Sequence, residues 1–151
     1  MKKGLFTVVG LVCCIFFFIG CSKIANTTNP SMSATIGSYN FIASATTPST
    51  LDTQLVDTTR TLMITGYGSD RVHPFDKIVL AVNNYKGIAG VYSIVQGQAG
   101  AAYYHNGTLS IATGGVVSIT SVSTTQINGY FRLTTSDNIV VDNGKFTVNL
   151  P

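Results

Sequence analysis

Residues 77–83 read KIVLAVN, and the alternation in this stretch decides the fold class. Ile78, Leu80 and Val82 occupy every second position, so in an extended chain their side chains lie on one face. Residues 61–66, TLMITG, repeat the pattern. A two-residue hydrophobic period is typical of a β-strand that buries one face. We therefore predict two strands here, both packed on a hydrophobic core.

Similar stretches occur along most of the chain. They are short, alternate apolar with small polar residues, and are bounded by Gly, Asn, Ser or Pro. The further predicted strands are residues 32–36, 39–43, 90–95, 101–105, 108–112, 116–122, 125–134, 139–141 and 145–150. Residues 44–58 are rich in Thr, Ser and Pro, and we predict a loop there, with or without a short edge strand.

Asn-Gly pairs mark several of the predicted turns. The pairs at 106–107 and 143–144 separate strand-like segments, and each predicts a tight β-hairpin, because Asn and Gly both accept positive φ. The pair at 128–129 lies within an alternating segment whose phase continues through it. For that pair we favour one bent strand over a second hairpin, since glycine also occurs at bulges.

The composition favours strands over helices. Charged residues make up 10% of the chain, against about 25% in a typical globular domain, and glutamate is absent. The polar surface must therefore consist of Thr, Ser and Asn, which favour strands and turns. We predict a single all-β domain over residues 32–151, a β-sandwich of about nine or ten short strands, with a closed β-barrel as the alternative. Phe131 and Phe146 are its predicted core anchors on neighbouring strands.

The N-terminus resembles a bacterial lipoprotein signal peptide. Two lysines open the chain, an apolar run covers residues 5–19, and Gly20 directly precedes Cys21. We predict a signal peptide over residues 1–20, with Cys21 as the site of lipid attachment. A membrane-spanning helix would need about 20 apolar residues, more than this run supplies. An ordinary secretory signal is the other alternative, and it would leave Cys21 as a free thiol.

Lipidation at Cys21 would set the location of the protein. Several acyl chains hold a protein stably on a bilayer, whereas one chain binds marginally. Residues 21–31 are polar, carry one charge, and are predicted to be a flexible tether. Ser22, with no aspartate at that position, suits sorting to the outer membrane. The predicted location is the bacterial cell envelope, lipid-anchored, at the outer membrane.

The charge balance argues against a nucleic-acid partner. Two of the nine basic residues belong to the signal peptide, which leaves seven against six aspartates. Nucleic-acid binding requires a basic stripe or patch, and this sequence has none. The predicted partners are the membrane lipid, through acylated Cys21, and an envelope protein or a glycan.

Five different short motifs follow one another along the domain: MxAxIG at 32–37, GVYxI at 90–94, GVVxIT at 115–120, INGYF at 127–131 and VDNGKFxV at 141–148. Together they resemble a family of Bacteroidetes-type lipoproteins, the domain of unknown function 6252. The resemblance implies an envelope location and an all-β fold. It implies no activity and no catalytic residue.

Residues 66–77, GYGSDRVHPFDK, form the stretch that most resembles a functional site. Asp70, Arg71, His73 and Asp76 are candidate contacts for a ligand or partner. The competing interpretation is a solvated loop, where charges gather because they cannot be buried. The spacing matches no known metal-ligand pattern, so we predict no metal and no cofactor. We interpret His105 as an exposed hairpin shoulder.

The sequence lacks the parts of familiar catalytic sites. It contains no Gly-x-Ser-x-Gly motif, and no cysteine would remain free after lipidation. We therefore predict no catalytic residues and a non-catalytic binding or interaction module; a structural envelope component is the alternative, and a hydrolase is less favoured. A cleft with converging polar groups would favour binding, an even Thr/Ser surface would favour a structural role, and a His–Asp pair facing one pocket would favour an enzyme.

Overall fold

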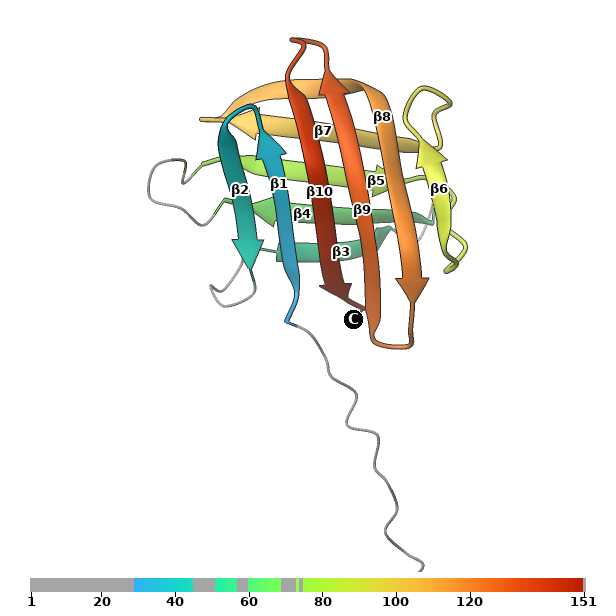
Figure 1. Cartoon of the computed structure of the whole chain (residues 1–151). Helices are drawn as coiled ribbons and strands as arrows, with labels where there is room; N and C mark the ends of the chain where they lie inside the picture. The colour runs from blue at the N-terminus through green and yellow to red at the C-terminus, as the bar shows by residue number, and fades with distance from the viewer. Residues whose placement is uncertain (1–28, 45–50, 57–59, 69–72, 74, 151) are drawn as a thin grey trace, which may run out of the picture.

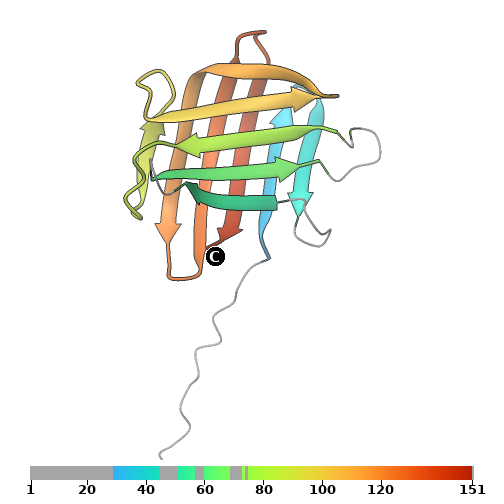
Figure 2. The same cartoon turned by 180° about the vertical axis from the view of Figure 1, so that it is seen from behind.

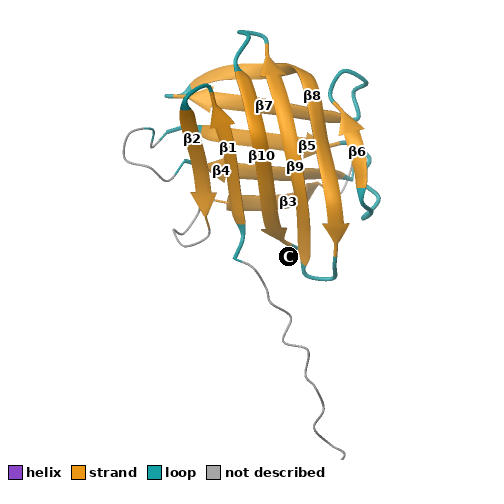
Figure 3. Ribbon diagram, viewed as in Figure 1, coloured by secondary structure: helices purple, strands orange, loops and turns teal. Residues whose placement is uncertain are grey.

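The computed structural model describes residues 29–44, 51–56, 60–68, 73 and 75–150. These parts of the chain form ten β-strands and contain no helix, which confirms the all-β prediction (Figure 3). No helix that could cross a membrane is present among them. The predicted signal peptide, Cys21 and most of the tether lie outside the described residues.

The strands follow the predicted segments closely along most of the chain. Their bounds are β1 Ser31–Ile36, β2 Tyr39–Ser44, β3 Leu51–Val56, β4 Thr61–Tyr67, β5 Lys77–Val82, β6 Gly90–Ser93, β7 Ala99–His105, β8 Thr108–Val122, β9 Gln126–Thr135 and β10 Val140–Asn149. β3 is the short edge strand that the sequence left open, within the predicted loop.

All strand pairs are antiparallel and form one curled sheet. Its hydrogen-bonded order is β2-β1-β10-β9-β8-β7-β5-β4-β3, and β6 pairs with β8 off this path. Figures 1 and 2 show that the sheet folds into two layers whose strands cross. One layer holds β2, β1, β10, β9 and β6, the other holds β7, β5, β4 and β3, and β8 takes part in both.

β8 joins the layers because it changes partner along its length, and its register with β9 shifts between Ala112 and Gly114. Thr108 to Ile111 pair with β7, whereas the rest of the strand pairs with β9. Gly115 has φ +119, and a Cβ there would overlap the backbone oxygen of Arg132. Two separate strands were predicted on either side of the glycines; this was wrong, because a glycine at positive φ bends a strand without ending it.

The predicted hairpin at Asn143-Gly144 was also wrong. β10 runs through this pair, Asn143 has φ 53, and the register with β9 shifts between Val141 and Gly144. The pair therefore forms a β-bulge, which accepts positive φ as a hairpin turn does. The chain reverses earlier, at residues 136–139, where the Asn138 N–H donates to the Thr135 carbonyl at 3.0 Å.

The other two Asn-Gly predictions were confirmed. The pair at 106–107 forms a two-residue turn between β7 and β8, with His105 opposite Thr108 and positive φ at both turn residues. The pair at 128–129 lies inside β9, which continues through it as a single strand.

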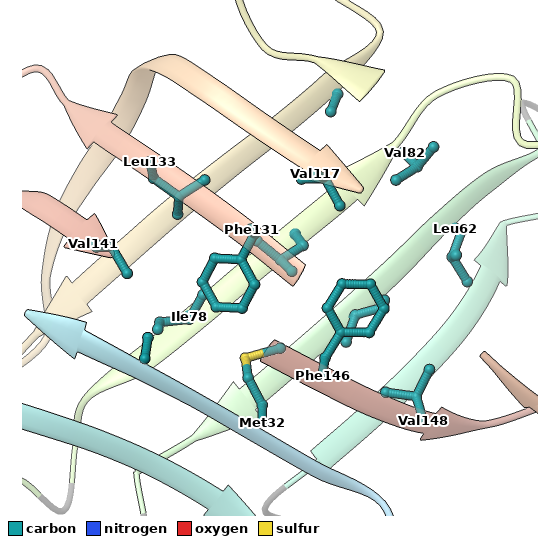
Figure 4. Close-up of a cluster of buried hydrophobic side chains, with 14 of the residues drawn as sticks. Met32, Leu62, Ile78, Val82, Val117, Phe131, Leu133, Val141, Phe146 and Val148 are labelled. Atoms are coloured by element: carbon teal, nitrogen blue, oxygen red, sulfur yellow. The ribbon is translucent and has the colours of Figure 1, made fainter. Parts of the chain in front are cut away.

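The core lies between the layers, and Phe131 and Phe146 are its central anchors, as predicted (Figure 4). Both side chains are 2% exposed, and their rings stack at a centroid distance of 6.4 Å. Phe146 pairs across the strands with Gly129, and Phe131 pairs with Gly144. A Cβ on either glycine would overlap the opposite ring. Each phenylalanine thus fills the space that the opposing glycine leaves, so both pairs act as one packing unit.

Candidate functional site

A pocket of about 520 Å³ lies where four segments meet at one end of the domain. The segments are the β1–β2 turn, the chain before β5, the end of β7 and the β9–β10 turn, which Figure 1 shows on the same side of the molecule. The walls are mainly apolar and carry four ring side chains. The lining residues are Ile36, Gly37, Tyr39, His73, Tyr103, His105, Asn138, Ile139 and Val140.

A buried carboxylate organises one wall of this pocket. Asp76 is 0% exposed, and its Oδ2 accepts a 2.6 Å hydrogen bond from the Tyr103 hydroxyl. The Asn106 N–H donates to Oδ1 at 3.2 Å, and His105 Nδ1 lies 3.1 Å from Oδ1. Buried charges require such partners, because leaving a buried carboxylate without them is very unfavourable. Asp76 therefore fixes both Tyr103 and the β7–β8 turn.

This contact also sets the tautomer of His105. An ionised carboxylate only accepts hydrogen bonds, so the Nδ1 atom that faces Asp76 must carry a proton. In the neutral ring Nε2 is then an acceptor, and the Asn106 side-chain nitrogen lies 3.3 Å from it. The His105 side chain is 49% exposed, so its far edge reaches the pocket and solvent. The contact with Asp76 therefore holds the His105 imidazole in one orientation at the pocket wall.

The remaining wall is built from ring side chains that pack against one another at tilted angles. The His73 ring lies 4.1 Å from the Tyr39 ring and 5.8 Å from the His105 ring, measured between centroids. The Tyr103 and His105 rings are 6.1 Å apart. Both histidines of the chain therefore meet here, from segments that are far apart in the sequence. Ring faces, imidazole nitrogens and apolar side chains together suit a ligand with a flat apolar surface and a few polar groups.

Burial raises the pKa of Tyr103 well above the ordinary tyrosine value of about 10, and its hydrogen bond to Asp76 adds to the rise. Below pH 10 the Tyr103 hydroxyl is protonated in both the folded and the unfolded chain, so its full contribution to the free energy of unfolding is present. Above pH 10 the unfolded chain loses the proton first, and the free energy of unfolding must fall as pH rises. Burial also raises the pKa of the buried Tyr85 and of the partly buried Tyr92.

We therefore expect alkaline unfolding to begin above about pH 10. In a spectrophotometric titration near 295 nm, the phenolate signal of Tyr103 should appear only with loss of β-sheet circular dichroism. In the Tyr103→Phe variant, the stability should depend less steeply on pH in this range. Ionisation of all seven tyrosines in a folded protein would contradict the burial of this hydroxyl.

The structure brings together two of the four predicted loop residues. His73 and Asp76 both belong to the site, whereas Asp70 and Arg71 lie outside the described residues. For Asp76 the solvated-loop interpretation was wrong, because its side chain is fully buried. His105 is half-exposed at the hairpin as predicted, but its contact with Asp76 was missed. The pairing of Lys77 with Tyr104 in the β5–β7 register places Asp76 beside His105.

The arrangement has two of the three parts of a nucleophilic triad. Asp76 orients His105 as a general base would require, but the side chain beside Nε2 is the Asn106 amide, which is no nucleophile. Among the residues that the structure describes, no group of three His, Cys, Asp or Glu side chains could hold a metal ion. The geometry is that of a shaped pocket with one fixed imidazole, suited to binding.

No family model, curated protein or solved structure matches this chain. The motif resemblance to the lipoprotein family accordingly stays an expectation.

Proposed function

We propose that this protein is a lipid-anchored, non-catalytic binding module of the bacterial envelope, whose ligand enters the pocket formed by Tyr39, His73, Tyr103 and His105. The observation that carries the proposal is the convergence of both histidines and two tyrosines on one hollow beside a buried carboxylate. Binding sites are concave, mostly apolar and provided with a few fixed polar groups. A structural component would need no such convergence.

The proposed ligand is a glycan or an aromatic segment of an envelope partner. Sugar rings and aromatic side chains both present a flat apolar face, which can pack on Tyr39 and the imidazole rings. The Nε2 edge of His105 and the Asn138 side chain are polar groups at the pocket wall that could receive hydroxyl or amide groups. Asp76 lies behind this wall and acts as a positioning residue.

A ligand screen by NMR tests the proposal. Monosaccharides and N-acetylated aromatic amino-acid amides are titrated into the mature chain while the imidazole signals of His73 and His105 are followed. We expect one of these classes to shift both signals. The Val140→Trp variant should lose the response, because Val140 lines the pocket and is 40% exposed, so a larger ring can fill the hollow.

Val95→Trp is the matched control, since Val95 is 76% exposed and does not line the pocket. It should respond as the unmodified chain does. If neither ligand class moves the imidazole signals, the pocket does not bind ligands of the proposed kind. The alternative, a structural component of the envelope, is then favoured. If Val140→Trp still responds fully, the ligand binds elsewhere.

The proposed location in the cell envelope is the second part of the proposal, and it rests on the N-terminal sequence. Changing Cys21 to serine should release the protein from membranes or stall its processing, because no thiol remains to carry the acyl chains. Cell fractionation and intact mass of the mature protein measure both effects. Cys13→Ser and Cys14→Ser are the controls and should leave retention unchanged. Full membrane retention of Cys21→Ser would refute the anchor.

A hydrolase is the second candidate, and one observation favours it: the Asp76–His105 pair borders the pocket. A hydrolase would require a nucleophile or an activated water at Nε2 of His105. Turnover of activated esters that is lost in His105→Gln but kept in His73→Gln would establish it.

For the architecture, we infer a β-sandwich rather than a closed barrel. The path of paired strands ends at β2 and β3, and the two layers cross with the core between them. β8, whose register shifts between Ala112 and Gly114, is then the strand that passes from one layer to the other. Such corners are made by bends and bulges in orthogonally packed sheets.

A further inference from the structure

The outward face of the layer that contains β4, β5 and β7 is unusually apolar. In these strands and the first part of β8, every second residue points into the core, and the residues between them point out. The outward residues also include Thr65, Met63 and Ala102; from among them we call Tyr67, Lys77, Val79, Tyr104, Leu109 and Ile111 the apolar face. Leu109 is 46% exposed and Ile111 58% exposed. Figure 2 looks onto this layer.

The strand registers place these side chains in two adjacent rows. Tyr67 pairs with Lys77, Lys77 with Tyr104, and Tyr104 with Leu109. The next row contains Val79 and Ile111, which both pair with Ala102. The rows are therefore contiguous, and they form one patch rather than scattered exposed residues. Contiguous apolar patches mark interaction surfaces.

The outward face of the other layer serves as the internal comparison, because its exposed apolar residues, Ile42 at 53% and Val91 at 65%, lie among polar groups. There Arg132 pairs with Asp142 at 2.7 Å, and Thr147 donates to Asn128 at 2.8 Å. Tyr130 is the exposed aromatic residue in the middle of these polar groups. Ser33, Lys145 and Ser118 separate the exposed apolar residues of this face. On the apolar face, by contrast, they are adjacent.

The charged residue in the middle of the apolar face, Lys77, is cationic. Lys77 Nζ lies 3.9 Å from the centroid of the Tyr104 ring and 5.9 Å from that of Tyr67. Its aliphatic stem therefore lies along the sheet, and its ammonium sits between two phenol rings. Tyrosine and lysine beside aliphatic residues are typical of protein surfaces at the headgroup region of a bilayer.

We propose that the apolar face rests on the headgroup region of the membrane that carries the lipid anchor. This inference rests on the proposed anchor at Cys21. The residues between Cys21 and Ser31 allow a reach of roughly 35 Å at full extension, so the domain stays close to the bilayer at high effective concentration. Lipid phosphates supply the anion for Lys77. Two copies packed face to face would instead bury both Lys77 ammonium groups away from water.

Tryptophan fluorescence tests the orientation, because the chain contains no tryptophan of its own. Ile111→Trp places a reporter on the apolar face, and Tyr130→Trp places one on the polar face. The full mature, lipidated chains are reconstituted in vesicles of phosphatidylethanolamine and phosphatidylglycerol, with or without lipids brominated near the headgroup. We expect the Ile111→Trp reporter to emit at shorter wavelength and to be strongly quenched, and the Tyr130→Trp reporter to be unaffected. Thermal unfolding confirms that both variants are folded.

Three other outcomes would overturn the proposal. Equal quenching of the two reporters in protein that sediments with vesicles refutes the proposal that the apolar face rests on the membrane, but it does not refute the lipid anchor. Protein that does not sediment with vesicles refutes the anchor, and the orientation falls with it. A short-wavelength emission of Ile111→Trp that is unquenched and grows with protein concentration identifies a second copy as the occupant.

Discussion

Replacing Phe146 with alanine is expected to lower the free energy of unfolding by about 3–5 kcal/mol, a large share of the 5–15 kcal/mol typical of a domain. Phe146 is 2% exposed, stacks on Phe131 and covers Gly129 of the neighbouring strand. Gly129 has no side chain that could refill the space, so the substitution leaves a cavity as well as lost apolar contacts. Denaturant unfolding followed by circular dichroism measures the effect.

Tyr130→Ala is the matched control, because it also removes an aromatic ring from β9, but one that is 49% exposed. Its effect should stay below about 1 kcal/mol. A Phe146→Ala variant as stable as the control would show that the two phenylalanine–glycine pairs do not form the packing centre of the domain. The phase of β9 and β10 would then have to be different.

Replacing Asp76 with alanine is expected to lower the free energy of unfolding by about 2–4 kcal/mol and to disorganise the pocket. The buried Tyr103 hydroxyl and the Asn106 N–H would lose their acceptor. The effect is smaller than for a fully buried ion pair, because His105 is half-exposed and can reach water. Denaturant unfolding gives the stability, and the imidazole NMR signals report the pocket.

Two further variants serve as comparisons for Asp76→Ala. Asp76→Asn keeps the size and one oxygen acceptor, so its loss of stability should be smaller than that of the alanine variant. Asp142→Ala removes a partly exposed carboxylate that pairs with Arg132, and it should change stability by less than about 1 kcal/mol. If Asp76→Ala proves no more harmful than Asp142→Ala, the buried carboxylate does not hold the site together.

The strands could be predicted from the sequence because alternation is a local property. The pattern in residues 77–83 requires only that one face of an extended chain be apolar, and β5 buries Ile78, Leu80 and Val82 as the pattern indicates. Turn residues were less informative, because positive φ serves more than one purpose. Asn106 turns the chain, whereas Asn143 has nearly the same φ within a bulge.

The site could be predicted only in part, because it depends on pairing between distant strands. His73 and Asp76 stood out in a chain with few charges and two histidines. Their partner His105 follows Asp76 by 29 residues, and the contact exists because β7 pairs with β5. β6 lies between β5 and β7 in the sequence, but it pairs with β8 instead of with either of them. No local pattern indicates this, so His105 looked like an ordinary hairpin residue.

The histidine tautomers test most directly whether Asp76 builds the pocket. Long-range ¹H–¹⁵N NMR spectra of the imidazole rings, recorded on the mature chain at neutral pH, distinguish the two ring nitrogens. For the neutral form of the His105 ring we predict the tautomer with the proton on Nδ1, protected from exchange, and contacts between this ring and Tyr103. A His105 ring with its proton on Nε2 and rapid exchange at Nδ1 would contradict the contact with Asp76, and with it the proposed site.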